Sequence, residues 1–238
     1  MIQLKDFSIG FNHKTLLKKI FSTFSDSSLT ALIGRNGSGK STLMKAMCGL
    51  NDKYEGEILI DSKNLRNIPR NQLAKKIAYV NTQRPRMANL YCRDVVALGR
   101  TPYVGWHGTL SVKDKEMVEE ALEKVDMLSY KDRLFNSLSD GESQKIMIAR
   151  AIAQDTEIII LDEPTSFLDL PTRYELVSLL KSLTEEKEKT IIFSTHELDI
   201  ALKFSDYISL IHTPDLINLT TAEMIAGEYL DNIFPSVK

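Results

Sequence analysis

A glycine-rich stretch, residues 34–42, constrains the fold and chemistry of this chain more than any other part of the sequence. It reads GRNGSGKST and fits the pattern G-x-x-x-x-G-K-[ST] at every fixed position. The apolar residues 29–33 before it are typical of a short buried strand, and residues 41–48 after it are typical of a helix. Strand, glycine-rich loop and helix, in that order, predict a loop that binds phosphate groups.

The residue types in this loop each suit contact with an anion. The glycines let the backbone bend and approach a ligand closely, and the start of the following helix adds partial positive charge. Lys40 supplies a full charge for the outer phosphates, and the Ser41 hydroxyl suits a magnesium ion. A chance match in a chain of ordinary composition has a probability of only about one per cent. The expected phosphate-binding residues are Gly34, Asn36, Gly37, Ser38, Gly39, Lys40, Ser41 and Thr42.

Length and composition limit the remaining possibilities. The 238 residues suffice for one large domain or for a domain with a substantial insert, and 43% of them are hydrophobic, so a core can form. The net charge of -2 offers no general attraction to nucleic acid, and we expect no nucleic-acid partner. The first residues do not resemble a signal peptide, and no apolar run approaches the ~20 residues of a membrane helix.

The N-terminal part of the chain alternates between apolar and polar residues. Two strands are expected within residues 1–30, separated by a turn near residues 10–14. Residues 55–61 form a third expected strand. These strands together predict a small antiparallel sheet beside the glycine-rich loop.

The middle of the chain, residues 84–152, has a helical pattern. Apolar residues recur at helical spacing over residues 111–128, and Ser111 can cap that helix. Another helix is expected over residues 139–153. We interpret this region as a helical insert.

Buried strands of a parallel sheet are expected on both sides of the insert. Residues 77–80, 158–161, 191–194 and 208–211 are short apolar runs, as strands covered on both faces should be. Helices are expected over residues 173–183, 200–204 and 221–226. Alternating strands and helices predict an α/β fold with a sheet covered on both faces.

Polar side chains follow two of these strands. Asp162 and Glu163 come directly after residues 158–161, at the strand end where such sheets bind ligands. Asp162 suits a role on magnesium, and Glu163 could orient or deprotonate an attacking water. His196 ends the next strand and could reach an outer phosphate or that water.

Residues 138–145, which read LSDGESQK, resemble the signature sequence LSGGQ of ABC-transporter ATPases. Asp140 replaces the first of the paired glycines, and Glu142 replaces the final glutamine. Ser139 and Gly141 remain at a helix N-terminus and are expected to approach a phosphate.

The resemblance covers nearly the whole chain and implies one ABC ATPase domain over residues 1–238. Its fold would be α/β: a P-loop NTPase with a RecA-like parallel-sheet core, a small antiparallel β subdomain and a helical insert. The nucleotide-binding core would comprise residues 1–83 and 153–238, and the helical subdomain residues 84–152.

The resemblance also implies roles for further residues. Phe11 falls where the family places an aromatic ring that stacks on adenine, and Asp169 matches the loop between paired subunits. His196 matches the family's switch histidine. The family has a glutamine that senses magnesium and contacts the membrane partner. Thr82 occupies its usual place, and Gln83 follows one residue later; we assign the role to Gln83.

Enzymes of this family work as head-to-tail homodimers that bind two ATP molecules, with Mg²⁺, at their interface. The resemblance therefore implies a peripheral ATPase on the cytoplasmic face of the inner membrane, with integral-membrane permease subunits and, indirectly, a secreted substrate-binding protein as partners. A groove between the helical insert and the core would receive a helix of the permease.

Residues 98–103, LGRTPY, and Trp106 resemble bacterial importers for iron-siderophore complexes, haem and cobalamin. This resemblance predicts the ATPase subunit of such an importer. The alternative is a soluble ABC ATPase of a non-transport assembly, such as one for iron-sulfur clusters.

Overall fold

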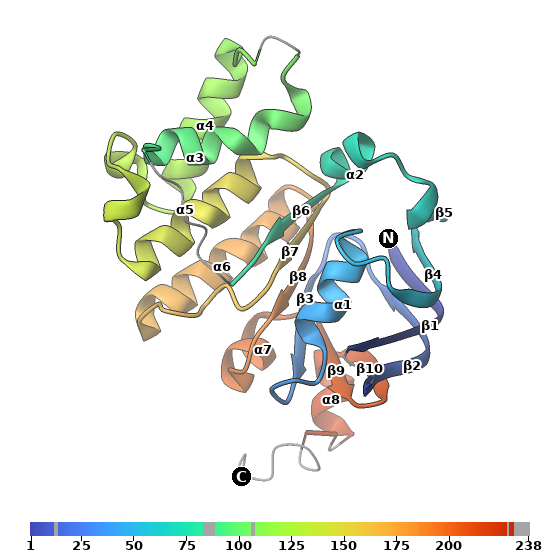
Figure 1. Cartoon of the computed structure of the whole chain (residues 1–238). Helices are drawn as coiled ribbons and strands as arrows, with labels where there is room; N and C mark the ends of the chain where they lie inside the picture. Colours follow the sequence, from blue (N-terminus) through green and yellow to red (C-terminus); the bar gives the residue numbers. More distant parts are fainter. Residues whose placement is uncertain (12–13, 83–88, 106–107, 228, 231–238) are drawn as a thin grey trace.

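Two β-sheets form the centre of the molecule in the computed structural model, which describes residues 1–11, 14–82, 89–105, 108–227 and 229–230 (Figure 1). A six-stranded sheet has the order β10-β9-β3-β8-β7-β6, and a four-stranded sheet has the order β2-β1-β4-β5. The strands are β1 (Ile2–Phe11), β2 (Lys14–Phe24), β3 (Leu29–Gly34), β4 (Tyr54–Ile60), β5 (Lys63–Asn64), β6 (Ile77–Val80), β7 (Ile158–Leu161), β8 (Thr190–Ser194), β9 (Tyr207–His212) and β10 (Asp215–Thr220).

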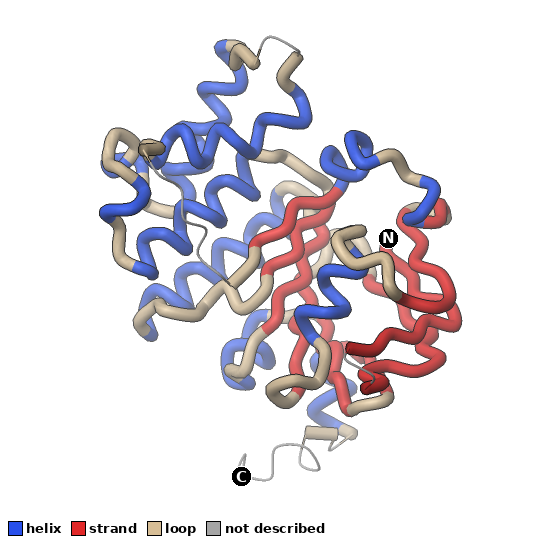
Figure 2. The backbone as a smooth tube through the Cα atoms, in the orientation of Figure 1, coloured by secondary structure: helices blue, strands red, loops and turns tan. Residues whose placement is uncertain are grey.

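Helices lie around these sheets, and those within residues 92–153 gather at the side of the molecule away from the four-stranded sheet (Figures 1 and 2). They are α1 (Lys40–Met47), α2 (Arg70–Lys76), α3 (Cys92–Ala97), α4 (Val112–Lys124), α5 (Asp140–Ala153), α6 (Leu170–Glu186), α7 (Leu198–Phe204) and α8 (Thr221–Ala226). Short 3₁₀ turns lie at Leu65–Asn67, Leu98–Tyr103, Leu128–Tyr130 and Phe135–Ser137. No helix in the described part of the chain is long and apolar enough to cross a bilayer.

The α/β fold expected from the sequence is confirmed. Strands β6, β7, β8, β3 and β9 run parallel, and β10 pairs antiparallel with β9 at the sheet edge. The expected antiparallel sheet of β1, β2 and β4 is also present, because β1 pairs antiparallel with both of the others. The short β5 extends that sheet beyond β4.

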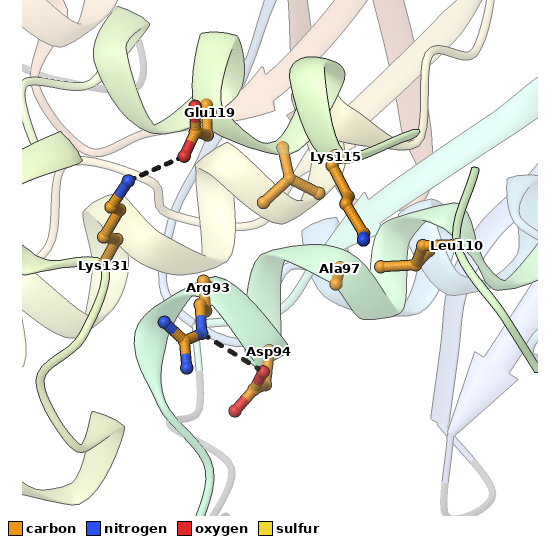
Figure 3. A pocket seen from close by; sticks show the side chains of 8 residues that line it. Arg93, Asp94, Ala97, Leu110, Lys115, Glu119 and Lys131 are labelled. Carbon is orange, nitrogen blue, oxygen red and sulfur yellow. Dashed lines mark hydrogen bonds and ion pairs between the residues drawn. The ribbon is translucent and has the colours of Figure 1, made fainter. Parts of the chain in front are cut away.

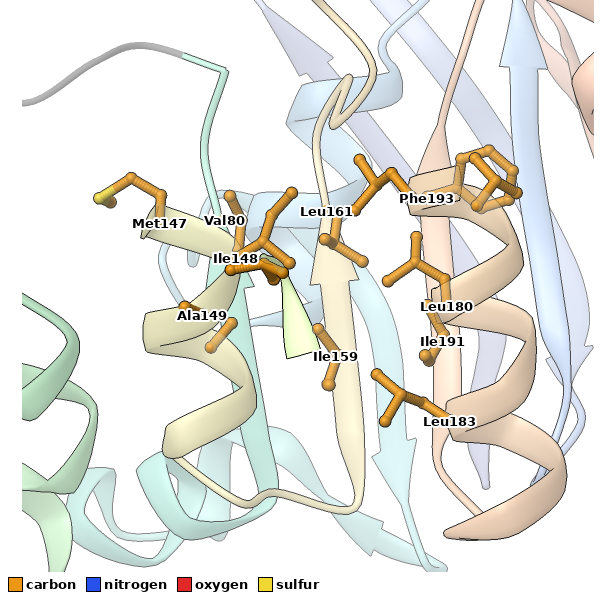
Figure 4. Packing of buried hydrophobic residues seen from close by; sticks show 14 of the residues in the cluster. Val80, Met147, Ile148, Ala149, Ile159, Leu161, Leu180, Leu183, Ile191 and Phe193 are labelled. Carbon is orange, nitrogen blue, oxygen red and sulfur yellow. The ribbon is translucent and has the colours of Figure 1, made fainter. Parts of the chain in front are cut away.

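Apolar side chains on both faces of the six-stranded sheet are buried in two separate clusters. On one face, Ile159 and Leu161 of β7 pack with residues of α5 and α6 (Figure 4). On the other face, Ile158 and Ile160 pack with residues of α1 and of the four-stranded sheet. Since successive side chains of a strand point to opposite faces, a continuous apolar run can fill both clusters.

Two details of the sequence-based prediction were wrong. The helix expected over residues 111–128 extends only over α4, because Asp126 has a left-handed backbone conformation, with φ of 58°, that ends it. The cap by Ser111 is present, since its hydroxyl accepts the Asp114 N–H. Strand β10 was not predicted at all.

The helical region contains α3, α4 and most of α5, which contact one another closely. Its buried residues, such as Val95 and Leu122, belong to the same cluster as Val80 and Ile159 of the sheet. The core of the sheet thus continues into the helical region, and the division of the chain at residues 84 and 152 stays a prediction.

Gly99 allows the turn Leu98–Tyr103 to lie directly against α5. A Cβ atom on Gly99 would stand 2.3 Å from the carbonyl oxygen of Arg150. We expect Gly99→Ala to lower the free energy of unfolding by about 1–3 kcal/mol, because the backbones must move apart. Urea denaturation would measure this loss. Gly105→Ala is the matched control, because no atom of the described residues other than its chain neighbours lies within 4 Å of its added Cβ. Equal midpoints for the two variants would contradict the packing argument.

Candidate active site

Three neighbouring parallel strands deliver the predicted site residues to one edge of the six-stranded sheet. Leu32 of β3 lies beside Ser194 of β8, and Leu161 of β7 lies beside Phe193. The glycine-rich loop follows β3, the two carboxylates follow β7, and His196 follows β8. The carboxyl ends of such strands are where open α/β sheets bind ligands.

The glycine-rich loop has the backbone of an anion-binding site. Gly37 and Gly39 have φ values of 74° and 107°, which side chains larger than glycine rarely allow. Helix α1 begins at Lys40 without a side-chain cap, so the N–H groups of its first turn stay available to a ligand. The Ser38 hydroxyl is buried and has no hydrogen-bond partner in the described residues.

Lys40 lies under this loop with only 6% of its surface exposed. Its Nζ donates to the carbonyl oxygens of Gly34, at 2.9 Å, and Arg35, at 3.5 Å. Burial lowers the pKa of Lys40, and the nearby charges of Glu163 and Asp162 oppose that shift. The loop carbonyls therefore hold the ammonium group, and the charges of the two carboxylates act on it from nearby.

A pocket of about 270 Å³ opens over the loop. It brings together many of the predicted site residues from three separate segments. Its lining comprises Phe11, Lys14, Leu16, Asn36, Gly37, Gly39, Lys40, Ser41, Thr42 and Glu163. Phe11 is 63% exposed at its rim, so its ring is accessible for stacking.

Asp162 and Glu163 are held by a residue that the sequence did not single out, Ser194. The Ser194 hydroxyl donates to Asp162 Oδ1 at 2.7 Å and accepts the backbone N–H of Glu163 at 2.8 Å. Ser194 is fully buried, and Asp162 is 3% exposed. Because a buried carboxylate needs hydrogen-bond partners, Ser194 fixes where both acidic residues lie.

Glu163 and His196 contact each other directly. The Nε2 atom of His196 lies 2.5 Å from Glu163 Oε1, and a ring N–H donates to the carboxylate. Glu163 has a left-handed backbone conformation, with φ of 50°, which is uncommon for a residue other than glycine. This conformation turns the chain sharply after β7, and the Glu163 side chain lines the pocket over the loop.

The glutamine assigned from the sequence, Gln83, lies outside the described residues. Thr82 is described, and its hydroxyl donates to the backbone carbonyl of Asp162 at 2.8 Å. The hydroxyl therefore has a structural partner on the segment that follows β7.

Ser139, Gly141 and Asp169 line a second pocket, of about 660 Å³. The described residues that line it include none of those that line the pocket over the glycine-rich loop. One chain thus does not bring its predicted phosphate loop and its signature residues together.

The signature residues also have local structural roles. Ser139 N–H donates to Glu142 Oε2 at 2.7 Å, and Glu142 N–H donates to Ser139 Oγ at 3.2 Å, which forms a capping box at the start of α5. These Ser139 groups also lower the pKa of Glu142. Gly141 packs on the next loop, because a Cβ there would stand 3.1 Å from the Phe167 carbonyl oxygen.

Asp169 caps α6, since its Oδ1 accepts the Thr172 N–H at 3.1 Å. The Thr172 hydroxyl and N–H lower the pKa of Asp169. The loop is further held by Arg173, which donates to the Leu168 carbonyl and to Glu197 Oε1. This Arg173–Glu197 pair was not predicted, because it depends on which strand ends lie side by side.

The chain is similar to known proteins over most of its length. The model of the ABC transporter family matches residues 17–166. An uncharacterised ABC transporter ATP-binding protein of Methanocaldococcus jannaschii is 36% identical over 91% of this chain and 75% of its own length. The iron(3+)-hydroxamate import ATP-binding protein of Bacillus subtilis is 30% identical over 98% of this chain and 87% of its own. The petrobactin import ATP-binding protein of the same organism is 34% identical over 98% and 92%.

Solved structures show the same fold. An inward-facing conformation of a metal-chelate type ABC transporter superposes with a TM-score of 0.85 at 25% identity, over 98% of this chain and 88% of that one. A dimeric ATP-binding cassette in a post-hydrolysis state, bound to ADP and Pi, has a TM-score of 0.82 at 27% identity, over 93% and 99%.

The hydrogen bonds of Ser194 give a test of the arrangement. We expect Ser194→Ala to lower the free energy of unfolding by about 1–3 kcal/mol, because Asp162 and the Glu163 N–H each lose a buried partner. Ser205→Ala is the matched control, since the buried Ser205 hydroxyl has no partner among the described residues. Thermal unfolding of both variants would compare them, and a harmless Ser194→Ala would argue against the bridging role.

Proposed function

This chain belongs to the ABC transporter family, and from that premise we propose that it is the ATP-hydrolysing subunit of an importer for an iron-siderophore, haem or cobalamin-type metal complex. The import proteins reported above support this choice, since they are named for iron(3+)-hydroxamate and petrobactin import and span 87% and 92% of their own lengths in the match. The observation that carries the ATPase assignment is the pocket that joins the glycine-rich loop to Glu163.

The chain binds ATP, and the loop suits its phosphates. The uncapped first turn of α1, the buried Ser38 hydroxyl and the Lys40 ammonium all offer hydrogen-bond donors in one place. In our proposal a phosphate oxygen replaces the Gly34 carbonyl as the partner of Lys40, and Phe11 stacks on the adenine.

Mg²⁺ is part of the same proposal. The Ser41 hydroxyl and the Asp162 carboxylate would hold the ion, directly or through water, together with Gln83, and the ion would neutralise charge on the phosphates. The described residues contain no group of three or more acidic, histidine or cysteine side chains that could hold a metal. A donor set of one carboxylate and one hydroxyl fits magnesium, which keeps several waters and phosphate oxygens as ligands.

Glu163 is the proposed base for the attacking water. Its carboxylate would accept a proton as the water oxygen attacks the terminal phosphorus and the bond from that phosphorus to the bridging oxygen of the departing ADP breaks. The His196 ring nitrogen fixes one carboxylate oxygen, and Ser194 fixes the Glu163 backbone. These contacts hold the base in place, so that little reorganisation is needed when charge develops.

Two copies would form each complete site. Ser139 and Gly141 line a different pocket from Lys40 and Ser41, and a head-to-tail pair would bring the first two of one copy to the phosphates on the other. Asp169 would lie between the subunits. The dimeric ATP-binding cassettes among the solved structures support this arrangement.

In this proposal, ATP binding and hydrolysis drive conformational changes in a separate permease. The permease would hold the subunit on the cytoplasmic face of the cell membrane. A groove of about 330 Å³ lies between α3 and α4 and could accept a short helix (Figure 3). It differs from the groove expected from the sequence, because both of its walls belong to the helical region.

The charges in this groove suggest an acidic partner. Arg93 lies near Asp94, and Lys131 bonds Glu119 at 2.7 Å. Lys115 has no ion pair among the described residues, and its amino group points toward Ala97 and Leu110 in Figure 3. We therefore expect a carboxylate of the permease to meet Lys115.

Glu163→Gln tests the hydrolytic step. We expect turnover of MgATP to fall by about 10²–10⁴-fold, because an amide cannot accept the proton of the water. ATP binding should persist, and ATP-dependent dimers should accumulate on size exclusion. Glu186→Gln, an exposed carboxylate at the end of α6, serves as the control. Rapid turnover by Glu163→Gln would remove Glu163 from the proposed role.

Co-purification from membranes tests the transport assignment. The tagged chain should recover a polytopic permease, whereas recovery of only soluble partners would favour a non-transport ABC ATPase. We expect Lys115→Glu to reduce permease recovery at least roughly tenfold, because a like charge would face the partner carboxylate. Lys113→Glu reverses an exposed charge on the same helix outside the groove and should leave recovery unchanged. Equal recovery by both variants would contradict the docking site.

A further inference from the structure

Helix α5 connects two parts of the proposed machinery. Its N-terminal end carries the signature residues Ser139 and Gly141. Its C-terminal end lies against the turn Leu98–Tyr103, which contains the LGRTPY motif. The function proposed above assigns no contact with nucleotide or permease to this turn.

Arg100 is the buried centre of that turn, with 6% of its surface exposed. Its guanidinium contacts three separate groups. The Nε atom donates to Asp114 Oδ1 at 2.8 Å, and Nη1 donates to the Ala153 carbonyl oxygen at 2.8 Å. The Tyr103 ring lies 4.1 Å from the guanidinium carbon. Arg100 thus joins α4, the end of α5 and its own turn at one point.

Arg100 and Asp114 lie close in the sequence to residues that line the docking groove. Ala97, three residues before Arg100, lines one wall, and Lys115, next to Asp114, lines the other. Asp114 also closes the capping box of α4 with Ser111. Ser111 and Arg100 lower the pKa of Asp114 to about 2, so the carboxylate stays charged. The Arg100–Asp114 pair therefore joins the turn that follows α3 to the first turn of α4, and these two helices carry the walls of the groove.

The same end of α5 is tied to the strand that leads toward Gln83. Arg150 Nη2 donates to the Tyr79 carbonyl oxygen of β6 at 3.0 Å. Gln154 Nε2 donates to the carbonyl oxygens of Ala74, at 2.7 Å, and Ile77, at 3.1 Å. Gly99 packs against the Arg150 carbonyl, as described above. The C-terminal end of α5 thus contacts both strand β6 and the turn that carries Arg100.

We propose that Arg100 is a positioning residue that couples the docking groove to the signature residues through α5. A displacement of α3 against α4 by the permease changes the geometry at Asp114, and the bond to Ala153 passes that displacement to the end of α5. A rigid helix then moves Ser139 and Gly141 at its other end. This inference rests on the proposed function. It assigns residues 98–103 to coupling between α4 and α5 and not to contact with the permease.

The guanidinium fork is what makes this coupling possible. Arginine donates from Nε and Nη1, two separate nitrogens held apart in one rigid plane, whereas lysine presents all of its N–H groups from a single nitrogen and cannot occupy both positions. Arg100→Lys keeps the charge beside Asp114 and removes the simultaneous bond to α5. The substitution therefore separates coupling from the ion pair itself.

The test uses the complex of this chain with its co-purified permease, and MgATP as the probe. We expect Arg100→Lys to leave MgATP affinity, ATPase activity of the isolated chain and permease recovery within about twofold of the unsubstituted chain. Stimulation of ATPase activity by the permease, at equal amounts of complex, should fall at least fivefold. If Arg100 had a purely structural role, the substitution would lower the unfolding midpoint without changing the ratio of ATPase activity with the permease to ATPase activity without it.

Three further variants keep the test decisive. Asp114→Asn should reduce the ratio in the same way, and the double variant should show no further loss, because both substitutions break one path. Asp114→Asn also replaces Arg100→Lys in the test if Arg100→Lys is unfolded at the assay temperature. Lys181→Met breaks the Lys181–Asp206 pair, which lies outside the helical region, and should leave the ratio unchanged.

The outcomes separate the inference from the proposed function. Unchanged stimulation in Arg100→Lys and Asp114→Asn would overturn the coupling role, and so would a loss of permease recovery equal to the loss of stimulation. Failure of the unsubstituted chain to recover any permease would instead overturn the transport assignment on which the inference rests.

Discussion

The parallel pairing of β3, β8 and β7 is the constraint on which the site depends. With β8 between the other two strands, the glycine-rich loop, the two acidic residues and His196 leave the sheet at one edge. The buried hydroxyl of Ser194, at the end of the central strand, then bonds both Asp162 and the backbone of Glu163. A different strand order would leave the same motifs in the sequence but would separate the groups that must act together.

How much of the site could be predicted depends on how far apart in the sequence its interacting residues lie. The phosphate loop and the Asp162–Glu163 pair could be proposed from the sequence because the residues of each motif are contiguous. Ser194 and the Arg173–Glu197 pair were missed because their roles exist only once particular strand ends are neighbours. The roles assigned to the predicted site residues stay predictions, and Gln83 lies outside the described part of the chain.

The fold shows the same division between local and distant signals. Most strands and helices were predicted from apolar runs and caps. Strand β10 was missed because it pairs only with β9, and its residues are nearly all half-buried, so they give no clear alternation. The predicted helix was longer than α4, because the residue in the left-handed conformation that ends α4 is Asp126 and not a glycine, which would have marked the end in the sequence.

The separation of the two pockets has a genetic consequence. If each nucleotide site of a pair draws its phosphate loop from one copy and its signature residues from the other, a defect in either pocket is shared between copies. A chain altered only at Ser139 would then impair the site on an unaltered partner while keeping its own phosphate loop intact. In a cell that makes both forms, mixed pairs would carry one defective site each, and the altered allele would be partly dominant. Two alleles with defects in different pockets would, in contrast, restore one complete site whenever they pair.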